Sequence, residues 1–163
     1  MKKIKILSIS NSFGVNLQTY PHQIAETNGV DLDIYVLYIG GCSLELHAKN
    51  IKTGAKVYEL FHNGESTKQM VSVLEGLKIQ DWDYIITQQV SGNSGKVETF
   101  YPYVNEVYDF VVKNAKFKKF GFQETWEYGP TLGIPYMIDI FKTYQNDYDQ
   151  MYHEIHAAYA EMS

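Results

Sequence analysis

Short apolar runs alternate with amphipathic stretches along this chain. Four runs rich in β-branched and aromatic side chains are typical of buried strands, and they lie at residues 4–9, 32–39, 84–87 and 117–122. Apolar residues at helical spacing indicate helices, chiefly at residues 70–77, 101–111, 134–143 and 147–162. Strands that alternate with helices predict an α/β domain with a parallel sheet and right-handed crossovers.

Local signals refine some of these boundaries. Thr19-Tyr20-Pro21 is typical of a helix start, and Asn28-Gly29 is typical of its end. Residues 44–63 are ambiguous, because residues 57–61 could form a helix. Ser66-Thr67-Lys68-Gln69 fits a capping box, which predicts that the following helix begins there.

Composition excludes several classes of function. The length of 163 residues predicts one domain spanning residues 1–163. The net charge is −5 and all 14 basic residues are Lys, so the chain offers neither guanidinium groups nor a basic surface for nucleic acid. Cys42 is the only cysteine, and the five His lack the spacing of a zinc site. We therefore expect no metal, no cofactor and no nucleic-acid partner.

The start of the sequence and its apolar runs bear on where the protein is expected to lie. No apolar run reaches membrane-spanning length, and the start MKKIKILSIS is too short and broken for a secretory signal. The sequence therefore predicts a cytoplasmic protein without a membrane partner.

Polar or glycine-rich segments follow each predicted strand. The carboxyl ends of parallel strands meet at one edge of the sheet, so these segments should gather there: residues 10–14, 40–43, 88–95 and 125–128. Acyl transfer needs a nucleophile and donors for an oxyanion. Ser12 can be the nucleophile, and the N–H groups of Ser12 and Gly41 with the amide of Gln89 or Gln88 can be the donors. Alternatively, Asn11 and Ser12 simply cap a helix, and the glycine pair simply makes a tight turn.

These segments together resemble the SGNH/GDSL hydrolase superfamily. The residues that carry the resemblance are ISNSF, YIGGCSLELH, WDYIITQQVSGNSGKVETF and QETWEY. More narrowly, they resemble a domain family of unknown function with the pattern GNSF, GGCSLE-x-H, WD…QQ-x-S and TWAY. The resemblance implies a flavodoxin-like three-layer αβα fold and a serine esterase that often acts on acylated carbohydrates. It implies Ser12 as nucleophile, Gly41 as the oxyanion glycine, and Gln89 or Gln88 where the superfamily has Asn.

The chain departs from that pattern at three points. Ser10 stands where the motif has Gly, and Glu127 stands where TWAY has Ala. The superfamily's catalytic His lies three residues after an Asp on a late loop that follows a further strand, and the sequence shows no such loop. We therefore expect a C-terminally incomplete domain without its last strand, whose open sheet edge could pair two copies of the chain. Asp149 and His153 should be an exposed i, i+4 helix pair.

Four residues are candidates for contact with a small-molecule or carbohydrate ester substrate: Asn11, Gln88, His47 and Trp126. His47 could instead pack in its loop, and it could replace the missing base only if that loop folds over Ser12. Trp126 could stack on a sugar ring or pack in the core. An alternative function is a catalytically inactive carbohydrate-binding domain of the same fold. A nucleotide or flavin binder is disfavoured because no G-x-G-x-x-G or Walker pattern occurs.

Overall fold

The computed structural model describes residues 2–129 and 134–162. Its strands are β1 (Lys2–Ser10), β2 (Val30–Tyr38), β3 (Tyr58–His62), β4 (Glu65–Val71), β5 (Trp82–Thr87) and β6 (Phe117–Phe122). Its helices are α1 (Ser12–Thr19), α2 (Pro21–Thr27), α3 (Leu44–Thr53), α4 (Val73–Leu77), α5 (Tyr103–Asn114), α6 (Pro135–Lys142) and α7 (Tyr148–Met162). Two 3₁₀ turns, η1 (Ser91–Asn93) and η2 (Val97–Thr99), lie between β5 and α5.

A six-stranded sheet with the order β4-β3-β2-β1-β5-β6 forms the centre of the molecule. Strands β2, β1, β5 and β6 run parallel, while β3 and β4 are antiparallel additions at one edge. The expected α/β class is therefore confirmed, with a sheet that is mostly rather than wholly parallel. Strand β6 forms the opposite edge.

The β3–β4 hairpin corrects two expectations from the sequence. Residues 57–61 do not form a helix, because Tyr58 and Leu60 alternate inward as strand residues. Asn63 and Gly64 make the turn with positive φ angles of 47° and 92°, as tight hairpins require. The predicted capping box at residues 66–69 lies inside β4 instead.

The true capping box lies a few residues later. The Ser72 side chain accepts from the Glu75 N–H, and the Glu75 carboxylate accepts from the Ser72 N–H at 2.8 Å. Helix α4 begins at Val73, so only the second half of the expected apolar stripe at residues 70–77 is helical.

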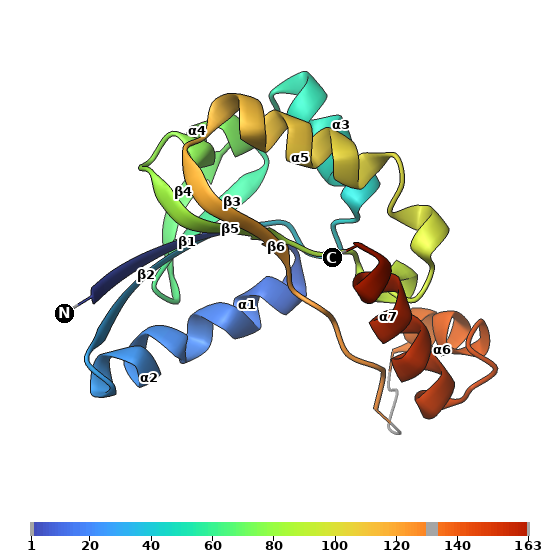
Figure 1. Cartoon of the computed structure of the whole chain (residues 1–163). Helices are drawn as coiled ribbons and strands as arrows, with labels where there is room; N and C mark the ends of the chain where they lie inside the picture. The colour runs from blue at the N-terminus through green and yellow to red at the C-terminus, as the bar shows by residue number, and fades with distance from the viewer. Residues whose placement is uncertain (1, 130–133, 163) are drawn as a thin grey trace.

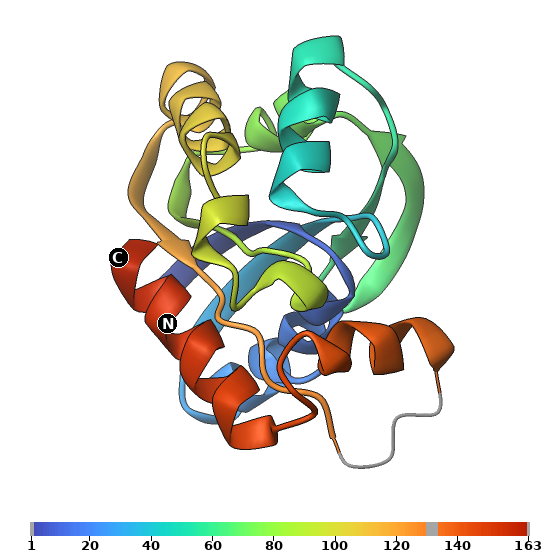
Figure 2. The same ribbon diagram turned by 90° about the vertical axis from the view of Figure 1, so that its right-hand side faces the viewer.

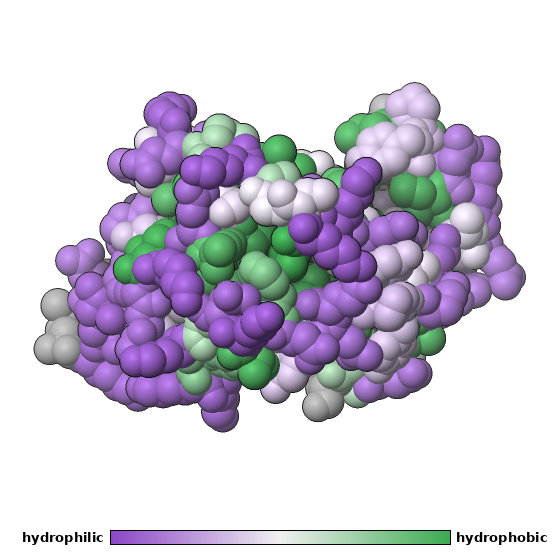
Figure 3. Space-filling view, turned by 90° about the horizontal axis from the view of Figure 1, so that it is seen from above, coloured by the Kyte–Doolittle hydropathy of each residue, from purple (hydrophilic) through white to green (hydrophobic). Residues whose placement is uncertain are grey.

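Helices cover the sheet on both faces (Figure 1). Helices α3, α4 and α5 lie on one face, and α1 and α2 lie on the other. The main core forms between the sheet and α3–α5 and includes Leu7, Leu37, Leu77, Ile85 and Val107. Seen from the α3–α5 side, apolar side chains remain visible in the middle of a largely hydrophilic surface (Figure 3).

A second hydrophobic cluster lies at the carboxyl ends of the strands. Helices α6 and α7 pack there against the segment between β5 and α5 (Figure 2). Phe100 contributes from that segment and Val104 from the first turn of α5, while Phe141, Met151 and Ile155 contribute from the two helices. This second core fixes the loop that follows β5, which forms part of the candidate site.

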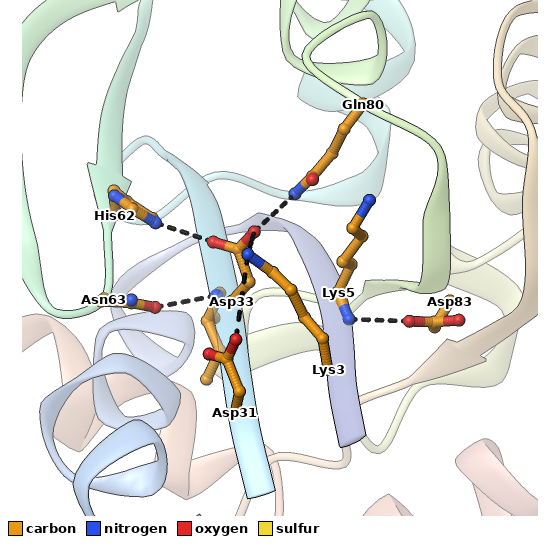
Figure 4. Close-up of polar contacts among 9 residues, drawn as sticks. Lys3, Lys5, Asp31, Asp33, His62, Asn63, Gln80 and Asp83 are labelled. Atoms are coloured by element: carbon orange, nitrogen blue, oxygen red, sulfur yellow. Dashed lines mark hydrogen bonds and ion pairs between the residues drawn. The ribbon is translucent and has the colours of Figure 1, made fainter. Parts of the chain in front are cut away.

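A polar cluster lies near the amino ends of β1 and β2 (Figure 4). Asp33, which is 8% exposed, accepts hydrogen bonds from His62 Nε2 at 2.8 Å and Gln80 Nε2 at 3.1 Å. Lys3 Nζ lies 3.2 Å from the same carboxylate. The cluster joins β1, β2, β3 and the segment after α4 at the end of the sheet away from the candidate site.

The helices within residues 2–129 and 134–162 are too short or too polar to span a bilayer.

Candidate functional site

Ser12 lies where β1 passes into α1. Strand β1 ends at Ser10, Asn11 is the N-cap in extended conformation, and Ser12 is the first residue of the eight-residue helix α1. The Ser12 side chain is exposed. As the first helical residue, Ser12 has a backbone N–H without an acceptor inside the helix. This N–H lies at the positive end of the helix dipole, where negative charge is stabilised.

Asn11 connects this turn to two other strand ends. Its Oδ1 accepts from the Phe13 N–H at 3.1 Å and from Gln88 Nε2 at 2.9 Å. Its Nδ2 donates to the Cys42 carbonyl at 2.9 Å and to the Gln89 carbonyl at 3.3 Å. Asn11 is only 1% exposed, so it lies beneath the surface on which Ser12 is displayed.

Gly41 follows β2 in a left-handed turn. Its φ is 65°, a conformation that favours glycine. The Cys42 N–H closes the turn by donating to the Ile39 carbonyl at 3.3 Å. The Ile39 N–H donates to the Ser10 carbonyl at 3.2 Å. Gly41 is exposed, while Cys42 beside it is buried. The end of β2 is thus bonded directly to the end of β1.

Gln88 and Gln89 are both buried within the protein. The Gln89 Oε1 accepts from the N–H groups of Leu44 and Val90, and its Nε2 donates to the carbonyl and hydroxyl of Thr99. An oxyanion role for Gln89 would therefore require exchange of these bonds. Gln88 is 0% exposed and reaches Asn11 rather than the surface. Its Oε1 is buried without a hydrogen-bond partner in the described part of the chain.

An aromatic pair borders Ser12. The Phe13 and Trp126 rings lie 4.3 Å apart between centroids, and Trp126 is 48% exposed. Gln123, just after β6, donates from Nε2 to the Phe13 carbonyl at 3.0 Å. The loop after β6 therefore joins the site, and an exposed indole lies next to the α1 start.

His47 lies in the interior, on α3. Its Nδ1 is 2.9 Å from the Tyr58 hydroxyl and 3.4 Å from Cys42 Sγ, and the ring is 0% exposed. Burial lowers the pKa of His47 to about 3, so the ring is neutral at physiological pH. Burial also raises the pKa of the Cys42 thiol to about 12. Of the alternatives left open for His47, this buried position on α3 fits packing and structural hydrogen bonding rather than contact with a substrate.

The remaining histidines lie elsewhere. His153 and Asp149 are both exposed on α7. The histidine ring nitrogens within residues 2–129 and 134–162 make hydrogen bonds to Cys42, Tyr58, Asp33 and Glu124, and none of these bonds reaches Ser12. The same ranges contain no group of three His, Cys, Asp or Glu side chains arranged to hold a metal ion.

Ser10, which replaces a glycine of the expected motif, is accommodated by Gly14. A Cβ atom at position 14 would lie 1.8 Å from Ser10 Oγ, so only glycine fits there. The turn after β1 therefore tolerates a serine at position 10, because Gly14 in the helix has no side chain and leaves room for the Ser10 hydroxyl.

Tyrosines hold the loop after β5, which the sequence reasoning did not foresee. The Tyr159 hydroxyl accepts from the Gln89 N–H at 3.0 Å, and the Tyr144 hydroxyl accepts from the Gly95 N–H at 3.2 Å. The Tyr128 hydroxyl lies 3.1 Å from Ser91 Oγ. The only sequence signal was the count of 14 Tyr, which does not reveal where their hydroxyl groups bind.

Comparison with known proteins identifies the family. The model of a domain of unknown function, DUF4886, matches residues 5–162. The chain belongs to the DUF4886 family. A crystal structure of a DUF4886 protein from Bacteroides uniformis is 29% identical, with a TM-score of 0.89 over 98% of this chain and 62% of that one. This chain thus spans less than two thirds of the length of that relative.

A second solved structure has a similar fold. A protein from Slackia heliotrinireducens described as a candidate SGNH hydrolase is 20% identical, with a TM-score of 0.60 over 98% of this chain and 73% of that one. At this identity the likeness concerns the fold alone. No curated protein matches the sequence of this chain.

Proposed function

We propose that this DUF4886 chain is a serine acyl hydrolase of the SGNH type that acts on small esters, such as an acetyl group on a carbohydrate. The observation that carries the proposal is the exposed Ser12 at the start of α1, bonded through Asn11 to the left-handed turn at Gly41. The shared fold with a candidate SGNH hydrolase supports the same class of reaction.

In this proposal Ser12 Oγ attacks the ester carbonyl carbon. The carbonyl π electrons move onto oxygen, and the N–H groups of Ser12 and Gly41 donate to the resulting oxyanion. Collapse of the tetrahedral intermediate breaks the bond to the alcohol, which leaves with a proton. Water then attacks the acyl-Ser12 ester, releases the carboxylic acid and restores the serine.

The proton of Ser12 Oγ needs an acceptor. His47 is buried among Cys42 and Tyr58, and histidine hydrogen bonds in the described ranges do not reach Ser12. Without an adjacent base, the attack is slow, because a general base contributes roughly 10²- to 10⁴-fold. Solvent, or an imidazole added to it, takes this role in the proposed reaction of this chain.

Trp126 suggests the carbohydrate part of the substrate. Its half-exposed indole packs on Phe13, the residue after Ser12. A flat, exposed aromatic surface next to a nucleophile suits the apolar face of a sugar ring that carries the ester. Glu127, next to Trp126 on the loop, can accept hydrogen bonds from sugar hydroxyls.

Hydrolysis of p-nitrophenyl acetate tests this function. We expect slow turnover by the wild-type chain that increases with added imidazole beyond the rate of imidazole alone. Ser12→Ala should remove the protein-dependent part. Ser66→Ala, which deletes a serine hydroxyl on the remote strand β4, should leave it unchanged. Equal rates for the wild type and Ser12→Ala, with and without imidazole, would refute Ser12 as nucleophile.

The burial of His47 favours a second candidate, a carbohydrate-binding domain without catalysis. In that case an acetylated xylo-oligosaccharide binds, Trp126→Ala abolishes the binding, and Ser12→Ala changes neither binding nor ester content. Release of acetate from the same oligosaccharide that depends on Ser12 would exclude this second function.

A further inference from the structure

We propose that Asn11 is a positioning residue, which sets the separation of the Ser12 and Gly41 N–H groups that receive the oxyanion. This inference rests on the function proposed above. It replaces the substrate-binding role expected for Asn11, because a side chain that is 1% exposed lies beneath the substrate surface.

Every donor and acceptor site of the Asn11 side-chain amide has a hydrogen-bond partner. An asparagine side chain has two hydrogens and two acceptor sites on its oxygen. Asn11 donates to the Cys42 and Gln89 carbonyls and accepts from the Phe13 N–H and Gln88 Nε2. Three loops, which follow β1, β2 and β5, therefore meet at this one side chain.

Each of the two proposed oxyanion donors belongs to a residue that is adjacent in the chain to a residue of the Asn11 hydrogen-bond network. Ser12 directly follows Asn11, and Gly41 directly precedes Cys42, whose carbonyl Asn11 binds at 2.9 Å. A change in the Asn11–Cys42 bond therefore changes the distance between the Ser12 and Gly41 N–H groups. Donors fixed before the reaction stabilise a developing charge without the cost of reorganisation.

Gln88 fixes the orientation of the Asn11 amide. Because Gln88 Nε2 and the Phe13 N–H are both donors, the oxygen of Asn11 faces them and its nitrogen faces the two carbonyls. Gln88 is 0% exposed, so solvent does not compete for this bond. Gln88 thus acts through Asn11 rather than on a substrate.

Asn11→Asp separates positioning from helix capping. Asp is as good an N-cap as Asn, so the bond from the Phe13 N–H remains. The second carboxylate oxygen, however, would face the Cys42 and Gln89 carbonyls without a hydrogen to donate. Asn114→Asp is the matched control, because Asn114 also donates to a carbonyl, that of Phe110 at 2.9 Å, but at the far end of α5.

Two readouts test the inference. In Asn11→Asp we expect the amide ¹H–¹⁵N resonances of Ser12 and Gly41 to shift. We also expect the rate of Ser12 labelling by a fluorophosphonate to fall by about 10- to 100-fold at unchanged half-saturating concentration. Asn114→Asp should alter neither. Unchanged Gly41 resonance and labelling in Asn11→Asp would overturn the inference.

A second variant keeps the test decisive if Asn11→Asp does not fold. Gln88→Met removes the bond to Asn11 Oδ1 together with the unpartnered Gln88 Oε1, so the fold should tolerate it. We expect the same resonance shifts and a smaller loss of labelling rate, and wild-type values for both would overturn the inference. If wild-type Ser12 is not labelled at all, the proposed function fails, while the resonances still report on positioning.

Discussion

At the scale of single residues, Asp33 shows how the end of the sheet opposite the candidate site is stabilised (Figure 4). Burial acts to raise the pKa of Asp33, but hydrogen bonds from His62, Gln80 and Lys3 outweigh it, and the pKa lies below its ordinary value of 3.8. The charged carboxylate is therefore the form that the fold prefers. Its stabilising effect is present above pH 3.8 and is lost as the pH falls below that value.

Asp33→Asn should lower the free energy of unfolding at neutral pH by about 1–3 kcal/mol, because it removes the charge that three donors share. Urea unfolding at a series of pH values measures this. The difference from wild type should shrink as the pH falls through 3.8. Asp31→Asn is the control, since Asp31 is more exposed and lies 4.0 Å from Lys3 Nζ. A difference for Asp33→Asn that does not depend on pH would show that the charge of Asp33 does not stabilise the fold.

The sequence predicted which residues gather at the candidate site better than it predicted what each of them does there. The order of Asn11, Ser12 and Gly41 after their strands predicted that they meet, because parallel strands share a carboxyl edge. The roles of Gln89 and His47 could not be derived, since they depend on Thr99 and Tyr58, whose side-chain directions follow from tertiary packing. A histidine near a glycine turn in sequence can still point into the core.

At the scale of elements, helix α7 holds the loop after β5 in place. Tyr159 on α7 is 4% exposed, and its hydroxyl accepts from the Gln89 N–H at 3.0 Å. Burial raises the pKa of Tyr159 to about 12, so the hydroxyl stays protonated at physiological pH. The loop that carries Gln88 and Gln89 thus depends on a helix about 70 residues further along the chain.

Tyr159→Phe should destabilise the protein by about 1–3 kcal/mol, because the buried Gln89 N–H loses its acceptor. Thermal and urea unfolding measure this. Tyr152→Phe removes a hydroxyl from a Tyr on the same helix that is 47% exposed, and it should change stability by less than about 0.5 kcal/mol. Equal effects of the two substitutions would show that the hydroxyl contact does not stabilise the loop.

Strands and helices were predictable from the sequence where a single hydrophobic pattern was strong. The four parallel strands were evident as apolar runs, and α5, α6 and α7 were evident from their spacing. The β3–β4 hairpin was missed because β4, ESTKQMV, lies at an edge and carries mostly polar side chains. The Asn63-Gly64 turn was the available signal, since this pair favours tight hairpins.

At the scale of the whole molecule, the two edges of the sheet differ. Strand β4 is protected by polar side chains, by Lys68 at a φ of 61° and by an irregular register with β3. Strand β6, FKKFGF, carries three phenylalanines and two adjacent lysines, and it borders a groove lined by Tyr101, Tyr108 and Phe120. The β6 edge is therefore the edge less protected against pairing with a strand of another molecule.

We predict that two copies of this chain pair through antiparallel β6 strands. A register centred on Phe120 puts Lys119 opposite Gly121 of the second copy and Lys118 opposite Phe122, so no lysines face each other. Light scattering over a range of concentrations should show a dimer. Gly121→Lys should weaken it by placing lysines opposite each other, and Gly121→Ser should not. A monomer at every concentration would contradict this prediction.

Trapping of the acyl-enzyme shows directly whether Ser12 is the nucleophile. The chain is mixed with p-nitrophenyl acetate, quenched in acid and digested, and the peptides are analysed by mass spectrometry. We expect one acetyl group on the peptide that contains Ser12. Fragmentation should assign it to Ser12, and it should be absent from Ser12→Ala. Acetylation only of lysines, at equal extent in both proteins, would show that Ser12 is not a nucleophile and that the proposed hydrolase function is wrong.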